Sequence, residues 1–170
     1  PVIAIRELGM SNAAYSLVIF AAAVANVLAS VGIGILADRR ASYRLPLIIT
    51  TGLGAAGFVT VYFLPSALVL GLVMVGPVAI YGASNALYFA KVKSHEAEFT
   101  RAETEQVGAL LRMMISLAWV LVPGAVGILL SGRASLLPAY LIAALLALAG
   151  LGVLVLGLPA DRERPAGVTG

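Results

Sequence analysis

The sequence predicts an all-α integral membrane protein, and three features of the 170-residue chain support this. First, 61% of the residues are hydrophobic and only 11% are charged, whereas soluble domains carry roughly 25% charged residues. Second, the charges gather in short stretches between long uncharged runs. Third, these runs exceed the ~18 residues that indicate a helix able to cross a bilayer. A membrane β-barrel would instead show short segments of alternating hydrophobicity.

Five transmembrane helices are expected, and the residues at their ends favour helix starts and turns. Ser11 and Asn12 are good N-cap residues before the first span. Pro46 lies near the start of the second span, where a missing N–H costs least. The long polar segment 91–105 has a spacing that allows a short amphipathic surface helix. The expected spans are 13–36, 45–64, 67–90, 106–130 and 136–158, in a partial bundle over residues 1–158 that is followed by a tail over 159–170.

Two of the expected spans contain an internal proline. Pro77 lies in the third span and Pro123 in the fourth. A proline removes one hydrogen bond from the helix ladder, and its ring clashes with the preceding turn. Each of these residues is therefore expected to kink its helix.

The distribution of Lys and Arg predicts which loops face the cytoplasm. Of the 11 basic residues, eight lie in the turn 37–44, the loop 91–105 and the tail. The opposite side of the expected bundle carries only Arg6 and Arg133. The positive-inside rule therefore places the turn, the loop and the tail in the cytoplasm, with the helices in the inner (plasma) membrane. This positional bias also explains the net charge of +3 without any binding of nucleic acid.

The chain lacks the residues that several kinds of catalytic and binding site require. The chain has no cysteine and one histidine, His95, in a charged loop, which argues against disulfides, thiolate catalysis and a metal site. No phosphate-binding Gly-x-x-x-x-Gly-Lys loop is present. We therefore expect no enzyme activity and no cofactor. No Asp or Glu lies within an expected span, so proton coupling would need a carboxylate outside these spans.

The turn after the first span carries a recognisable motif. The pattern Gly34-x-x-x-Asp38-Arg39-x-Ala41-x-x-Arg44 resembles the cytoplasmic motif between the second and third helices of major facilitator superfamily transporters. Ala41 stands here in place of a second glycine, and Tyr43 in place of a basic residue. The position of the motif between two spans also agrees with that superfamily. The resemblance implies a gating motif that comprises Gly34, Asp38, Arg39 and Arg44.

The fourth span narrows the resemblance. The run from Arg112 through Ser116 and Trp119 to Pro123 looks like the fifth helix of bacterial sugar efflux transporters in this superfamily. The same region is also similar to a Gly-Pro motif of drug exporters. The chain would then supply the second to sixth helices of a twelve-helix protein. Its partners would be the missing first helix and C-terminal bundle, the lipid bilayer and a small-molecule substrate.

The resemblance implies secondary active transport by alternating access, with efflux of sugars or sugar-like small molecules. One alternative is a multidrug/proton antiporter of the same superfamily. A second alternative is a truncated membrane scaffold that does not transport. Five helices from one half cannot enclose an alternating-access cavity alone, so a scaffold remains open at this point.

The substrate pathway is expected along polar faces of three spans. Arg112 is the one charge inside a span, and an arginine near a helix centre costs about 2.5–3.5 kcal/mol, so it faces a cavity or a partner, or snorkels to the surface. Ser116 and Trp119 continue its face. An indole can stack on the apolar face of a sugar while polar groups bind its hydroxyls. Further polar candidates, which could instead serve interhelical packing, are Tyr81, Asn85 and Tyr88 on the third span and Asn26 on the first.

The gating motif yields a first testable prediction. A carboxylate at the C-terminal end of a helix faces the negative end of the helix dipole, so Asp38 needs a cation or another helix N-terminus. The resemblance implies that Asp38 grips the opposite half of the transporter, with help from Arg39. Asp38→Asn is expected to abolish transport, measured in cells, while the protein still reaches the membrane at normal abundance. Normal uptake and efflux in this variant would contradict the assignment.

Overall fold

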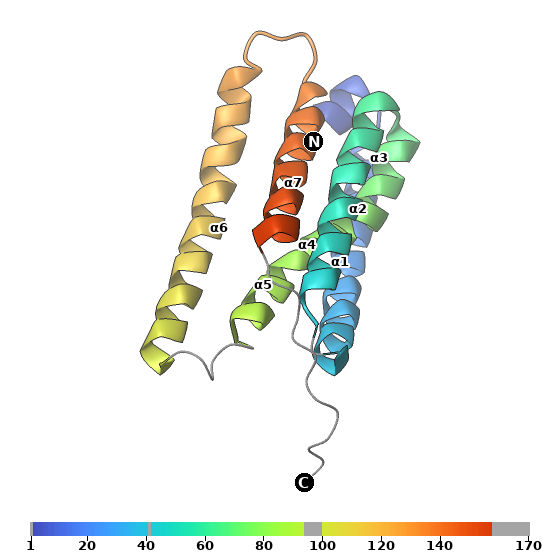
Figure 1. Ribbon diagram of the computed structural model, residues 1–170. Coiled ribbons are helices and arrows are strands. Elements are labelled where there is room, and N and C mark those ends of the chain that lie inside the picture. The colour runs from blue at the N-terminus through green and yellow to red at the C-terminus, as the bar shows by residue number, and fades with distance from the viewer. Residues whose placement is uncertain (1, 41, 94–99, 158–170) are drawn as a thin grey trace.

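The computed structural model describes residues 2–40, 42–93 and 100–157, and every regular element in these ranges is a helix. The helices form a bundle in which the long elements run roughly along one direction (Figure 1). Five of the described helical stretches are long and apolar enough to cross a membrane. The predicted fold class, an all-α membrane protein with five spanning helices, is therefore confirmed.

The third span is divided into several pieces, whereas the other spans are single helices. A short π-helix, η1, precedes the first span. In chain order the elements are η1 (Ile3–Glu7), α1 (Asn12–Arg40), α2 (Arg44–Phe63), α3 (Ala67–Val73), η2 (Met74–Val78), α4 (Ala79–Gly82), α5 (Ser84–Lys93), α6 (Arg101–Leu129) and α7 (Pro138–Gly157).

The first helix is longer than expected. It continues to Arg40 instead of ending at residue 36, so Asp38 and Arg39 belong to its last turn and not to a loop. A closing hydrogen bond explains this, because the Ser42 N–H donates to the Ala37 carbonyl at 3.2 Å. Ala37 itself is fully buried. The turn between α1 and α2 is therefore short and tied to the core.

The fourth span also starts earlier than expected. Thr100 and Glu103 form a capping box, in which the Thr100 hydroxyl accepts from the Glu103 N–H and Glu103 Oε2 accepts from the Thr100 N–H at 2.8 Å. This box starts α6 at Arg101. Residues 101–105 are thus the first turn of the membrane helix and not part of a separate surface helix. Residues 94–99, with His95, and the expected tail lie outside the described residues.

The third span is interrupted near its middle, close to Pro77. This proline lies inside the π-helical turn η2, whereas α6 continues as an unbroken α-helix through Pro123. Pro77 has no N–H to donate to the preceding turn, which is why the helix widens there. A second irregularity follows, because the Ala83 N–H donates to the Ile80 carbonyl at 3.1 Å instead of the carbonyl four residues back.

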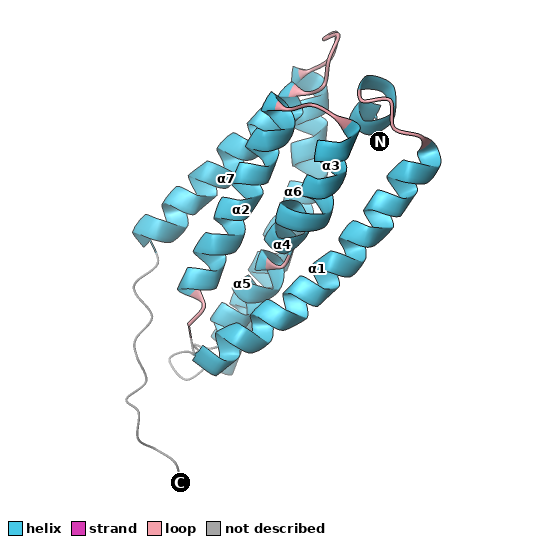
Figure 2. Cartoon of the chain, turned by 90° about the vertical axis from the view of Figure 1, so that its right-hand side faces the viewer, coloured by secondary structure: helices cyan, strands magenta, loops and turns pink. Residues whose placement is uncertain are grey.

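Two glycines on α2 let the irregular third span approach closely. A Cβ added at Gly54 would lie 2.8 Å from the Tyr81 Cβ, and one at Gly57 would lie 3.0 Å from the Pro77 Cβ. Small residues allow such close helix contacts in lipid, where packing replaces the hydrophobic effect as the driving force. Helix α7 packs along α2 as well, so α2 lies between α7 and the third span (Figure 2).

The bundle has a buried cluster near each end. One cluster lies at the end that carries η1, and the other at the end that carries the α1–α2 turn, here called the η1 end and the turn end. At the η1 end, Glu7 accepts from the Ser135 hydroxyl at 2.6 Å and from the Leu136 N–H at 2.8 Å, which ties η1 to the segment before α7. The buried residues are Ala4, Met10, Val61, Leu70 and Val73 at the η1 end and Ala37, Leu47, Leu87 and Leu154 at the turn end.

The close approach at Gly54 can be tested by stability measurements. Gly54→Ala is expected to lower the free energy of unfolding by about 1–3 kcal/mol, because the added methyl group overpacks the contact with the Tyr81 ring. Gly52→Ala is the matched control, since nothing lies within 4 Å of an added Cβ there. Alanine is the better helix former, so the control should unfold at the same temperature or slightly higher. Equal thermal unfolding of the two variants in detergent would contradict the packing described here.

Candidate functional site

A cavity of about 490 Å³ lies between α6 and the irregular third span, with Phe58 of α2 also at its wall. Four of the predicted pathway residues line it, namely Tyr81, Asn85, Tyr88 and Trp119. The structure thus brings together side chains of the third and fourth spans, which are far apart in the sequence. Ser84 adds one further hydroxyl-bearing residue to the same cavity.

These polar residues of the third span lie on both sides of the irregular turn at Ala83. Tyr81 lies in the short helix α4, and Ser84 begins α5 directly after the irregular turn. The Tyr81 ring is fixed against α2, because it makes a T-shaped contact with Phe58 at 5.9 Å between centroids and fills the space that Gly54 leaves. Ser84 was not among the residues predicted from the sequence. Its spacing was the signal that could have revealed it, since a residue three positions after Tyr81 and four before Tyr88 lies on the same helix face.

Trp119 forms the opposite wall of the cavity. It lies on α6 and its side chain is 72% exposed. None of the described residues of α6 is buried, and the helix lies at the edge of the bundle (Figure 1). The described residues thus leave the indole ring open, and its face is available to a molecule that enters the cavity.

Arg112 and Ser116 occupy α6 as well but do not line this cavity. The guanidinium carbon of Arg112 lies 5.9 Å from the centroid of the Phe89 ring on α5. This distance fits a cation–π contact, which contributes about 0.5–1 kcal/mol at an exposed site. Arg112 therefore has a partner on α5, and its role in the pathway stays a prediction, as does that of Ser116.

Asn26 connects α1 to the interruption in the third span. Its Nδ2 atom donates to the Ala79 carbonyl at 2.7 Å. This carbonyl is available because the Ala83 N–H bonds to Ile80 instead. Gly82 makes the approach possible, since an added Cβ there would collide with the Asn26 side-chain nitrogen. In the structure Asn26 therefore satisfies the open backbone, and it is not among the residues that line the cavity.

The residues of the predicted gating motif point to different surroundings at the turn end, because some are exposed and one bonds to α7. Asp38 and Arg39 are exposed at the end of α1, while Gly34 lies half-buried one turn earlier. Arg44 instead donates from Nη2 to the Val155 carbonyl at 2.8 Å. A cation is favourable at this position, because the last carbonyls of a helix carry partial negative charge. Arg44 thus ties α2 to the end of α7.

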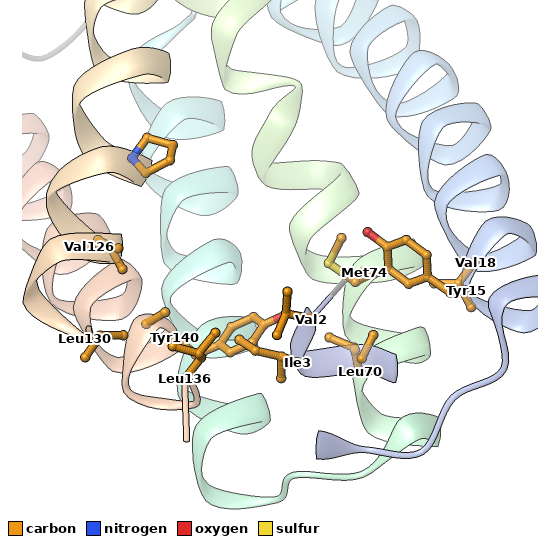
Figure 3. Close-up of a pocket in the computed structure, with 14 residues that line it drawn as sticks. Val2, Ile3, Tyr15, Val18, Leu70, Met74, Val126, Leu130, Leu136 and Tyr140 are labelled. Atoms are coloured by element: carbon orange, nitrogen blue, oxygen red, sulfur yellow. The ribbon is translucent and has the colours of Figure 1, made fainter. Parts of the chain in front are cut away.

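A second cavity of about 340 Å³ lies at the η1 end. Figure 3 shows side chains from η1, α1, α3, α6 and α7 around it. Most of the labelled side chains are aliphatic, and Tyr15 and Tyr140 add the only labelled hydroxyl groups. Pro123 borders both this cavity and the first one. The two cavities therefore share Pro123 of α6 as a wall residue.

The chain is similar to a curated protein of Deinococcus radiodurans that is named "Putative sugar efflux transporter". The two are 35% identical over 161 residues, which is 92% of this chain and 40% of the relative. The chain thus spans well under half the length of this relative. No family model matches the chain. No solved structure matches it either.

The bond from Asn26 to the interrupted helix gives a prediction about stability. Asn26→Ala leaves the Ala79 carbonyl without its donor, so the free energy of unfolding should fall by about 1–2 kcal/mol. Ser30→Ala, one turn further along α1, is the matched control, because the structure assigns no hydrogen bond to the Ser30 side chain. Thermal unfolding in detergent measures both variants. Unchanged stability of Asn26→Ala relative to Ser30→Ala would show that the bond contributes little.

Proposed function

We propose that this chain forms part of the N-terminal bundle of a major facilitator superfamily transporter that exports sugars or sugar-like small molecules. The observation that carries the proposal is the cavity in which Tyr81, Asn85 and Trp119 meet beside the interrupted third span. The name of the Deinococcus relative supports the same cargo class. In this proposal the cavity is one half of a substrate site that a second bundle completes.

The chemistry of the cavity suits a small polar molecule with apolar faces. Its volume of about 490 Å³ falls in the range of roughly 300–1,000 Å³ that is usual for small-molecule sites. The exposed Trp119 ring offers a flat apolar surface for the C–H face of a sugar ring. On the opposite wall, the Asn85 amide and the Tyr81 and Tyr88 hydroxyls can donate to and accept from sugar hydroxyls.

The interrupted helix supports a transport mechanism. Discontinuous membrane helices are common at the substrate sites of secondary transporters, because an irregular backbone is tolerated where it lines a cavity. The third span has its π-turn at Met74–Val78 and its second irregularity at Ala83, next to Tyr81 and Ser84. The proposal places substrate at this point, with access alternating as one bundle rocks against the other.

The open side of α6 supports the expectation of a further helix from the same transporter. The described residues of α6 are all at least partly exposed, and two cavities border its inner face. A helix that preceded η1 would begin its course next to the cavity at the η1 end, where Val2 and Ile3 already form the wall. The missing first helix is proposed to cover α6, and the C-terminal bundle to close the substrate site.

The proposed orientation places the turn end in the cytoplasm of the cell and the η1 end outside its inner membrane, in accordance with the positive-inside rule. Cysteine labelling tests this, because the chain contains no cysteine of its own. Cysteines outside this chain would first be replaced by serine. In intact cells, a membrane-impermeant maleimide should label Arg133→Cys, between α6 and α7, but should label Lys93→Cys, at the end of α5, only after permeabilisation. The reverse pattern would contradict the orientation.

The role of Trp119 gives the main functional test. Trp119→Ala in the full-length protein is expected to reduce efflux of labelled sugars about three- to ten-fold, the factor that corresponds to a lost stacking contact of roughly 0.5–1.5 kcal/mol. Trp119→Phe should retain part of the activity, because a ring remains.

Val120→Ala is the matched control for Trp119→Ala. Val120 is the next residue on α6 and is 71% exposed, close to the 72% of Trp119, but it does not line the cavity. This control should export sugar at the normal rate. Equal sugar efflux from the two variants would contradict the assigned site. Efflux of lipophilic cations in place of sugars from the unsubstituted protein would instead favour a drug exporter.

A further inference from the structure

We infer that Tyr43 is the positioning residue of the α1–α2 turn, and that its hydroxyl aims the Asp38 carboxylate toward the group that docks on this turn. The Tyr43 hydroxyl donates to Asp38 Oδ1 at 2.6 Å. The inference rests on the proposed function, and on the gating motif to which the resemblance to that superfamily assigns Asp38. The inference thus gives a role to Tyr43, which stands where the superfamily motif has a positively charged residue.

The Tyr43 ring is anchored while its hydroxyl is directed outward. The ring packs against the buried cluster at the turn end, which includes Ala37 and Leu47. Asp38 is exposed, one residue beyond the fully buried Ala37. An exposed carboxylate samples several rotamers unless a neighbour holds it. The Tyr43 phenol therefore links the Asp38 side chain to the buried cluster.

The neighbours of Tyr43 hold the turn in one geometry. The Ser42 N–H donates to the Ala37 carbonyl at 3.2 Å, which closes α1. Arg44 donates to the Val155 carbonyl at 2.8 Å, which fixes the start of α2 to the end of α7. Three consecutive residues thus connect the turn to α1 and α7. Tyr43 therefore lies between two residues that are bonded to neighbouring helices.

The bond leaves Asp38 able to bind a second group. A carboxylate has about four acceptor sites on its two oxygens, and the Tyr43 hydroxyl uses one of them. Because phenol is neutral, the carboxylate keeps its full negative charge for a cation or a helix N-terminus on the docking partner. A basic residue at position 43 could aim the carboxylate in the same way through an ion pair.

Two substitutions separate the donor of Tyr43 from its ring. Tyr43→Phe keeps the ring in the cluster and removes the donor, whereas Tyr43→Arg keeps a donor of similar reach and removes the ring. The test uses the full-length protein with a reporter cysteine, Ala118→Cys, which lines the cavity and carries no polar group in the native protein. In inside-out membrane vesicles, the rate of maleimide labelling at this reporter measures how often the cavity opens to the cytoplasm.

Tyr43→Phe is expected to raise the labelling rate about three- to ten-fold, the factor for the loss of one hydrogen bond from a two-state equilibrium. Asp38→Asn should raise it by at least as much, and adding Tyr43→Phe to Asp38→Asn should raise it no further, because both act through one contact. Tyr43→Arg should label at close to the rate of the reporter alone.

Other results overturn the inference. The inference fails if Tyr43→Phe labels at the same rate as the reporter alone. It also fails if the double variant labels faster than Asp38→Asn by the same factor that Tyr43→Phe shows by itself. A Tyr43→Phe protein that does not fold, judged by size-exclusion chromatography, would also count against it, because the hydroxyl would then stabilise the bundle. If Tyr43→Phe behaves as expected but the unsubstituted protein exports no sugar, the proposed cargo fails while the role of Tyr43 stands.

Discussion

A backbone carbonyl within the hydrocarbon core of a membrane must find a donor inside the protein, and the arrangement of this bundle depends on how one such carbonyl is satisfied. Pro77 and the irregular turn at Ala83 interrupt the third span, and the Ala79 carbonyl loses its usual partner. Asn26 supplies the donor from α1 at 2.7 Å. The bond fixes α1 to the interrupted helix at mid-span, and Gly82 leaves the space it needs.

The same interruption shapes the candidate substrate site. It brings Tyr81 against α2, where Gly54 gives the ring room and Phe58 meets it edge-on. A new helix starts at Ser84, and residues on both sides of the irregular turn line one cavity. The close packing of the third span on α2 thus supports the cavity wall, while α6 contributes the exposed face opposite.

Much of the architecture could be predicted from the sequence, because the long uncharged runs leave little choice. A run of about 20 apolar residues in a membrane protein forms a helix, since no other single segment satisfies its backbone in lipid. The ends of two helices were predicted less well than the helices themselves. The extension of α1 to Arg40 depends on the bond from Ser42 to Ala37, whereas the start of α6 at Arg101 follows a local pattern, the capping box of Thr100 and Glu103, that the expected span left out.

The sequence by itself determined the helical class, the five spans, the weak point at Pro77 and the kinds of polar residue that the spans carry. Only the tertiary structure decided which of these residues meet. It joined Tyr81 and Asn85 to Trp119 across one cavity, and it used Asn26 for a backbone carbonyl. The physical reason is that periodicity assigns a residue to a face of its own helix, whereas the neighbour of that face depends on contacts between distant segments.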